Sequence, residues 1–137
     1  MQIPPEHVNA GKPRILIVDD EPENRRLFRK LVENKYPTVA IDEAPDGLEA
    51  VHNIRTHAPD LVILDLHLPG ISGLQVCRII REEQKGKIKV LAITGHNTDD
   101  SRRQALEAGA DDFLGKPFMV KELAQKIEEL LSRDPSA

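Results

Sequence analysis

Short apolar runs separated by helical spacing constrain the fold of this chain more than any other feature of its sequence. The clearest runs are Ile15–Val18, Leu61–Leu64 and Val90–Ile93. Successive side chains of a strand point to opposite faces of its sheet, so an unbroken apolar run predicts a strand that is buried on both faces. Such strands belong to parallel sheets that helices cover on both sides. The sequence therefore predicts a βα repeat.

The alternation continues along the chain and predicts five strands and five helices. The expected strands lie near Arg14–Val18, Val39–Glu43, Leu61–Leu64, Lys89–Ile93 and Asp111–Leu114. The expected helices begin near Pro22, Asp46, Ser72, Asp99 and Met119. The predicted fold class is α/β, with a doubly wound, five-stranded parallel sheet.

Local signals support several of these helices. The expected apolar stripes of the first two helices are Leu27, Phe28, Leu31 and Val32, and Leu48, Val51 and Ile54. Asp46 and Thr98 are expected to cap the second and fourth helices, because their side chains accept hydrogen bonds from free amides of the first turn. Gly109 is expected to end the fourth helix, where a left-handed residue is common.

The length and composition indicate one globular domain. With 137 residues, 39% of them hydrophobic, the chain is long enough for a core and too short for two domains. We expect a domain over residues 14–132, an N-terminal tail over 1–13 and a C-terminal tail over 133–137. The formal net charge of −4 gives no reason to expect direct binding of nucleic acid.

No apolar run approaches the roughly 18 residues that cross a bilayer, and the N-terminus lacks a secretion signal. The single cysteine, Cys77, forms no internal disulfide and is expected in a helix core. We therefore expect a cytoplasmic protein without a membrane partner. The basic cluster Arg25, Arg26, Arg29 and Lys30 is interpreted as the solvated face of the first helix.

Polar residues with a shared chemistry follow four of the strands. Asp19 and Asp20 follow the first strand, Asp65 the third, Thr94 the fourth and Lys116 the fifth. Ligands of open parallel sheets bind in the crevice outside the carboxyl ends of the strands. Three acids, a hydroxyl and an ammonium are therefore expected to converge on one pocket.

The three carboxylates need protons or a cation, since two of them about 4 Å apart repel by roughly 4 kcal/mol at an effective dielectric of 20. Oxygen ligands alone favour Mg²⁺, which keeps several waters and recruits phosphate oxygens. Asp65 is then expected to be a nucleophile that forms an aspartyl phosphate. Lys116 would neutralise the incoming phosphoryl group, and the Thr94 hydroxyl would donate to one of its oxygens.

Each of these residues has a simpler explanation when it is taken alone. Asp20 could cap the first helix, with Glu21 and Pro22 in its first turn. Asp65 could cap a loop, and a threonine or lysine after a strand is common. The specific feature is their joint placement at separate strand ends.

Four motifs resemble the response-regulator receiver domain of two-component signal transduction, the domain type of chemotaxis receivers. They are Ile15–Pro22, Asp46–Ala50, Pro59–Pro69 with Gly73, and Gly109–Phe118. The resemblance covers Arg14 to Leu131. It implies a flavodoxin-like (βα)5 fold with strand order 2-1-3-4-5.

The resemblance also implies a role for each pocket residue. Asp65 matches the phosphoacceptor, and Thr94 and Lys116 match the other two catalytic residues. The implied Mg²⁺ ligands are Asp19, Asp20, Asp65 and the backbone carbonyl of His67. Thr94 and Phe113 match the switch residues, and the bond before Pro117 is cis in the family.

Two departures from the family pattern concern the switch and the lifetime of the phosphoryl group. Phe113 stands where many members have tyrosine, so its ring has no hydroxyl with which to contact a partner. His67 and His96 lie two residues after the phosphoacceptor and two after the switch threonine. Family members tune the phosphoryl lifetime at these positions, so both histidines are expected to affect it.

The function that the resemblance implies is a phosphoacceptor switch, not an enzyme, since it catalyses only its own phosphorylation and dephosphorylation. A histidine kinase or histidine phosphotransfer protein would phosphorylate Asp65. The face of the fourth helix, fifth strand and fifth helix would then change its affinity for an unidentified output partner or domain, or form a dimer.

Two alternatives remain open. One is a degenerate receiver that binds partners without phosphorylation. The other is an aspartyl-phosphate hydrolase of the haloacid dehalogenase type, although those enzymes place the nucleophile after the first strand in an Asp-x-Asp motif. Here Asp65 follows the third strand, and its second neighbour is His67.

Overall fold

The computed structural model describes residues 13–132. Its strands are β1 (Arg14–Val18), β2 (Ala40–Ala44), β3 (Leu61–Asp65), β4 (Lys89–Thr94) and β5 (Asp112–Gly115). Its helices are α1 (Pro22–Lys35), α2 (Gly47–His57), α3 (Gly73–Gln84), α4 (Asp99–Ala108) and α5 (Val120–Ser132). The tails predicted for residues 1–13 and 133–137 lie, apart from Pro13, outside the described residues.

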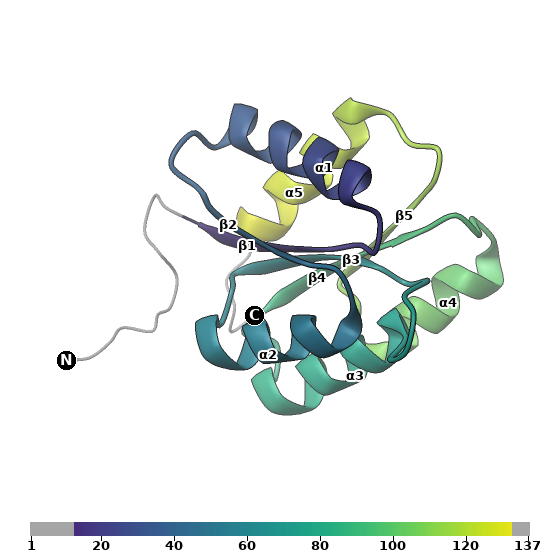
Figure 1. Ribbon diagram of the computed structural model, residues 1–137. Helices are drawn as coiled ribbons and strands as arrows, with labels where there is room; N and C mark the ends of the chain where they lie inside the picture. The colour runs from purple at the N-terminus through teal and green to yellow at the C-terminus, as the bar shows by residue number, and fades with distance from the viewer. Residues whose placement is uncertain (1–12, 133–137) are drawn as a thin grey trace.

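The five strands form one parallel sheet in the order β2-β1-β3-β4-β5. Helices α1 and α5 cover one face of the sheet, and α2, α3 and α4 cover the other (Figure 1). The predicted fold class and the strand order implied by the resemblance are therefore confirmed. All five strands run in the same direction, so their carboxyl ends meet at one edge of the sheet.

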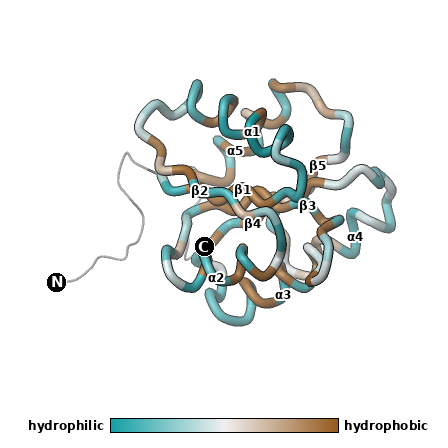
Figure 2. The backbone as a smooth tube through the Cα atoms, viewed as in Figure 1, coloured by the Kyte–Doolittle hydropathy of each residue, from teal (hydrophilic) through white to brown (hydrophobic). Residues whose placement is uncertain are grey.

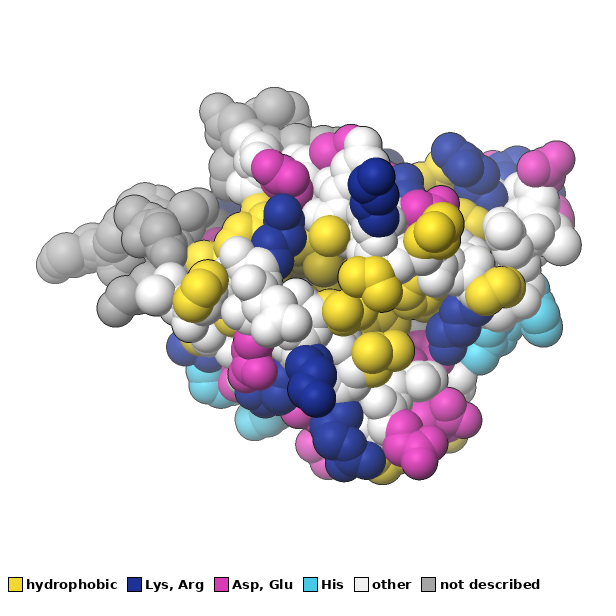
Figure 3. Space-filling model, turned by 90° about the horizontal axis from the view of Figure 1, so that it is seen from above, with side chains coloured by type: hydrophobic (Ala, Val, Ile, Leu, Met, Phe, Trp, Pro, Cys, Tyr) yellow, Lys and Arg dark blue, Asp and Glu magenta, His cyan; other side chains and the backbone are white. Residues whose placement is uncertain are grey.

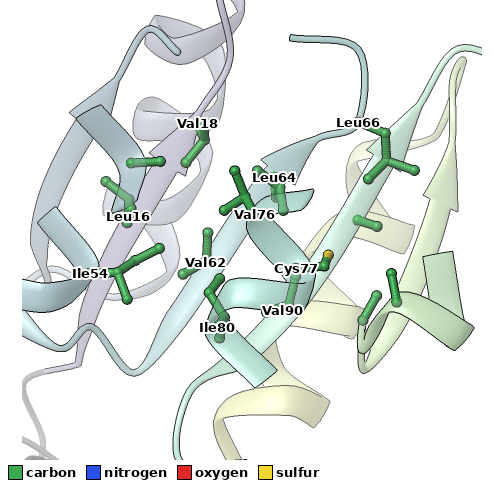
Figure 4. Packing of buried hydrophobic residues seen from close by; sticks show 14 of the residues in the cluster. Leu16, Val18, Ile54, Val62, Leu64, Leu66, Val76, Cys77, Ile80 and Val90 are labelled. Carbon is green, nitrogen blue, oxygen red and sulfur yellow. The ribbon is translucent and has the colours of Figure 1, made fainter. Parts of the chain in front are cut away.

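The central strands are buried on both faces, which explains their unbroken apolar sequence. Leu16 and Val18 of β1 belong to the cluster under α2, α3 and α4, whereas Ile15 and Ile17 belong to the cluster under α1 and α5. Figure 2 shows the apolar strands between the more polar helices, and Figure 4 shows the packing of the first cluster. Cys77 is fully buried in that cluster, as expected.

Two strands begin one residue later than the sequence predicts. The amide of Val39 donates to the carbonyl of Tyr36 at 3.0 Å, so Val39 closes the turn after α1 and β2 begins at Ala40. The Asp111 carboxylate accepts a hydrogen bond from the Val90 amide at 2.8 Å. Asp111 therefore contacts β4 through its side chain, and the regular main-chain pairing of β5 with β4 begins at Asp112.

The apolar stripes of α1 and α2 are narrower than expected. Phe28 and Val32 are buried on α1, but Leu27 is 51% exposed. On α2, Val51 is buried, whereas Leu48 is 69% exposed. A helix that packs on one face of a sheet buries only the side chains nearest the sheet, so an apolar residue at the margin of the stripe stays in solvent. Figure 3 shows apolar side chains gathered on the face formed by α1 and α5.

The predicted helix caps are confirmed. Asp46 accepts a hydrogen bond from the Glu49 amide at 2.9 Å, and Thr98 accepts one from the Ser101 amide at 3.0 Å. Gly109 ends α4 with a φ of 117°, a left-handed conformation that glycine adopts readily. Within residues 13–132, no helix is both long and apolar enough to cross a bilayer.

Candidate functional site

Three acidic side chains meet at the carboxyl edge of the sheet. Asp19 and Asp20 follow β1, and Asp65 is the last residue of β3. One carboxylate oxygen from each lies within 4.8 Å of the others. Asp19 and Asp65 are buried, with 1% and 7% of their surface exposed, whereas Asp20 is exposed. The cluster therefore has two carboxylates inside the fold and one at its surface.

The loop after β1 is held in place mainly through Asp19. Its carboxylate accepts a hydrogen bond from the Glu21 amide at 2.9 Å and contacts the side-chain amide of Asn24 at 3.3 Å. Glu21, not Asp20, is the N-cap of α1, and its side chain makes no capping bond. The simpler explanation of Asp20 as a helix cap is therefore wrong. Asp20 follows the anchored Asp19 with its carboxylate exposed.

Arginine side chains of α1 also support this loop. The sequence analysis did not predict these contacts. Arg25 donates to the main-chain carbonyl of Asp19 at 2.7 Å and to the Glu43 carboxylate at 3.0 Å. Arg29 also donates to Glu43, at 2.7 Å. Only part of the basic cluster is thus a solvated face. The partner Glu43 is distant in sequence, so no local pattern could have indicated the contact.

Asp65 lies close both to a cation and to the other two acids. Its Oδ1 accepts a hydrogen bond from the His67 amide at 2.8 Å, and its Oδ2 lies 3.8 Å from Nζ of Lys116. Burial raises the pKa of Asp65, and the His67 amide lowers it. The Asp19 carboxylate raises this pKa further, whereas Lys116 opposes that effect. A buried carboxylate close to two acids and an ammonium suits a reaction with a phosphate bound to a cation.

The loop after β5 brings Lys116 to this position. The Lys116 amide donates to the Thr94 carbonyl at 2.7 Å, which continues the pairing of β4 with β5. The peptide bond between Lys116 and Pro117 is cis. Phe118 stacks against Phe28 of α1, with ring centroids 5.9 Å apart. The lysine loop is therefore packed onto the helix that follows the acidic pair.

Gly73 allows the start of α3 to approach the main chain at Asp65. A Cβ atom at Gly73 would lie 2.5 Å from the carbonyl oxygen of Asp65 and 2.5 Å from Cα of Leu66. Both neighbours are main-chain atoms, which cannot rotate away. Glycine at this position is therefore a steric requirement of the site.

Thr94 is fully buried, yet its hydroxyl contacts two exposed histidines. The hydroxyl lies 2.9 Å from Nε2 of His67 and accepts a hydrogen bond from the His96 amide at 2.9 Å. The two imidazole rings meet edge to face, with centroids 4.4 Å apart. The structure thus brings both histidines, which were expected to affect phosphoryl lifetime, to the hydroxyl of Thr94.

Phe113 is already inside the protein. Its ring is 4% exposed and belongs to the apolar cluster on the α2, α3 and α4 side of the sheet. Phe113 pairs with Ala92, so it lies on the same face of the sheet as Thr94, two residues further along β4. The two expected switch residues are therefore neighbours on one face.

A doubly wound parallel sheet with an acidic pocket and a lysine at its carboxyl edge defines a receiver-type signalling domain. The model of the response regulator receiver domain matches residues 15–128. The chain belongs to this family, whose members are signalling switches of two-component systems.

Curated relatives agree with this assignment. The chain is 41% identical over 124 residues to the transcriptional regulatory protein ResD of Bacillus subtilis (strain 168), a match that covers 90% of this chain and 50% of ResD. It is 40% identical over 121 residues to the response regulator MprA of Mycobacterium sp. (strain KMS), covering 88% of this chain and 51% of MprA. The chain thus spans about half the length of these relatives.

Solved structures show the same fold. The signal receiver domain of a DNA-binding response regulator from Colwellia psychrerythraea 34H superposes with a TM-score of 0.83 at 31% identity, covering 89% of this chain and 100% of that one. The response regulator domain of CheB from Thermotoga maritima gives a TM-score of 0.77 at 26% identity, covering 90% and 99%.

Proposed function

We propose that this domain accepts a phosphoryl group on Asp65 from a histidine kinase or a histidine phosphotransfer protein, in the presence of Mg²⁺. The observation that carries the proposal is the position of Asp65, whose carboxylate lies within 4.8 Å of two other acids and 3.8 Å from Lys116. An attacking carboxylate oxygen forms a bond to phosphorus while the bond from phosphorus to the donor breaks. The product is an aspartyl phosphate.

The three acids suit Mg²⁺ as a bound ion. Magnesium prefers oxygen ligands, keeps several waters and binds through a few carboxylates together with phosphate oxygens. Asp19, Asp20 and Asp65 supply such ligands, and we propose the backbone carbonyl of His67 as another. When bound, the ion would offset the charge that accumulates on the phosphoryl oxygens. Lys116 contributes a fixed positive charge to the same group.

Removing the acidic pair is expected to weaken Mg²⁺ binding. The Asp19→Ala, Asp20→Ala double variant keeps one of three carboxylates, and we expect its affinity to fall by about tenfold or more, as with other lost ligands. A titration with MgCl₂, followed by amide chemical shifts, measures the change. Glu23→Ala removes an exposed acid of α1 and is the matched control. Phosphorylation of the double variant at the wild-type rate in the same magnesium would show that this metal site is misassigned.

We further propose that Thr94 couples Asp65 to the face formed by α4, β5 and α5. Phosphorylation acts at a distance by favouring one of two pre-existing arrangements. In the favoured one, the Thr94 hydroxyl donates to a phosphoryl oxygen. Because the ring of Phe113 is already buried, the change that we propose centres on Thr94 and does not require the ring to enter from solvent.

The Thr94→Ala variant is expected to be phosphorylated without transmitting the signal. It keeps Asp65, Lys116 and the acidic pair, but its side chain cannot donate to the phosphoryl group. Hydrogen exchange of α4, β5 and α5 amides, measured with and without acetyl phosphate, should then show no phosphorylation-dependent change. Thr56→Ala, which removes a hydroxyl of α2 that bonds to the His52 carbonyl, is the control. A normal distal response in Thr94→Ala would contradict the coupling.

The signalling partners of this chain follow from the same proposal. A donor must present its phosphohistidine to Asp65, and an output partner or domain must distinguish the two arrangements of the α4, β5 and α5 face. The cytoplasmic location, the phosphorylation-dependent dimer and the effect of His67 and His96 on phosphoryl lifetime stay predictions.

A further inference from the structure

In the absence of a phosphoryl group, the hydroxyl of Thr94 already donates its single proton in a hydrogen bond within the protein. The His96 amide can only donate, so the hydroxyl oxygen accepts that bond. The side chain has no exposed surface, so its own proton must find a partner within the protein, because an unpaired buried donor is unfavourable. Nε2 of His67, at 2.9 Å, is the acceptor that the structure offers.

We propose that His67 is a positioning residue whose ring Nε2 accepts the Thr94 hydroxyl hydrogen bond and thereby holds the switch in its resting arrangement. This inference rests on the proposed role of Thr94 as the switch hydroxyl. A hydroxyl donates one hydrogen bond at a time. Thr94 must therefore release His67 before it donates to a phosphoryl oxygen on Asp65.

Neighbouring contacts keep the ring and the loop in the geometry that this bond needs. The edge of one imidazole meets the face of the other, with His67 and His96 centroids 4.4 Å apart. Further along the same loop, Asn97 occupies the space beside Gly115 at the end of β5, where a Cβ atom would lie 2.5 Å from the Asn97 Cβ. The loop after β4 thus packs against β5 through Asn97. The His96 amide of this loop and the ring of His67 both contact the Thr94 hydroxyl.

The bond has a defined consequence for the switch. It stabilises only the resting arrangement, so its loss shifts the population toward the arrangement in which Thr94 is free to donate elsewhere. A hydrogen bond of ordinary strength changes such an equilibrium by about fivefold. His67 thus sets how much phosphorylation the domain needs before its distal face responds.

The first test needs neither phosphorylation nor metal. In ¹⁵N-labelled protein at about pH 8, the imidazole nitrogens of His67 should show the proton on Nδ1 and an acceptor at Nε2. Thr94→Val, which removes the hydroxyl and keeps the side-chain shape, should shift the Nε2 resonance. A proton on Nε2, or an unchanged resonance in Thr94→Val, would overturn the inference.

The second test measures the switch with beryllofluoride, an analogue of the phosphoryl group. In His67→Leu the midpoint of the amide-shift response of α4, β5 and α5 should fall by about fivefold, the effect of one hydrogen bond. His67→Gln places an amide oxygen near the former Nε2 and should restore the wild-type midpoint. His96→Ala keeps the main-chain donor and should shift the midpoint less than His67→Leu.

The outcomes of the two tests separate this inference from the proposed function. Equal midpoints in wild type and His67→Leu would overturn the inference, as would a failure of His67→Gln to restore the midpoint. If beryllofluoride binds none of these proteins, the proposed function fails at Asp65. In that case the first test alone decides whether His67 accepts a hydrogen bond from Thr94.

Discussion

Asp65→Asn is expected to abolish phosphorylation of this protein by acetyl phosphate and Mg²⁺. The amide oxygen of asparagine is a poor nucleophile, and the amide carries no charge to pair with Lys116, which lies 3.8 Å from Asp65 in the structure. Intact-protein mass spectrometry should show one added phosphoryl group on the wild type and none on the variant. The group should be acid-stable and base-labile, as an acyl phosphate is.

The control for this experiment is another strand carboxylate that lies outside the pocket. Asp42 lies in the middle of the edge strand β2 and forms an ion pair with Arg14, the first residue of β1, so Asp42→Asn should be phosphorylated normally. Stoichiometric labelling of Asp65→Asn at another residue would refute the assignment of the acceptor. An unlabelled wild type would support the degenerate receiver, and turnover of a phosphomonoester would support the hydrolase.

The same substitution is expected to stabilise the fold in magnesium-free buffer. Asp65 is buried, and this burial is the largest cause of its raised pKa. One of its carboxylate oxygens also lies within 4.8 Å of an oxygen of each of two other acids. Charges about 5 Å apart repel by roughly 3 kcal/mol at an effective dielectric of 20. Asparagine removes this repulsion, so the free energy of unfolding should rise by roughly 1 to 3 kcal/mol. Urea denaturation with EDTA present measures the difference.

The sequence allowed the sheet and its pocket to be predicted because both depend on short stretches of chain. Each apolar run encodes a strand that is buried on both faces, and the residue after the run lies at the carboxyl edge. Asp19, Asp65 and Thr94 were therefore placed near one another without knowledge of the tertiary contacts. The strand order was not encoded in this way and came from the resemblance to the family.

Contacts between distant segments could not be predicted from the same patterns. The link from Arg25 to Glu43 and the Asp19 carbonyl depends on how α1 lies across β2. The bond between His67 and Thr94 joins the loop after β3 to the last residue of β4, 27 residues further along the chain. Likewise, the 51% exposure of Leu27 depends on which side of α1 faces the sheet, whereas its apolar character alone predicts burial. These features arise when the elements pack together, after local preferences have formed them.

Gly73→Ala is expected to cause the largest loss of stability among single-methyl changes near the pocket. The added Cβ would lie 2.5 Å from both the Asp65 carbonyl oxygen and the Leu66 Cα, so α3 and the end of β3 must separate. Overpacking of this kind typically destabilises a protein by about 1 to 3 kcal/mol, and main-chain neighbours place this case near the upper limit. The midpoint of thermal unfolding should fall by about 10 °C.

Circular dichroism measures the midpoint of thermal unfolding of Gly73→Ala, and Gly95→Ala is the matched control. A Cβ at Gly95 would meet nothing within 4 Å, so that variant should unfold within about 0.5 kcal/mol of the wild type. Because the clash at Gly73 acts on the main chain of Asp65, phosphorylation should also slow at temperatures where the variant is still folded. Equal midpoints for the two variants would show that α3 does not need glycine to approach β3 and that Asp65 is positioned by other contacts.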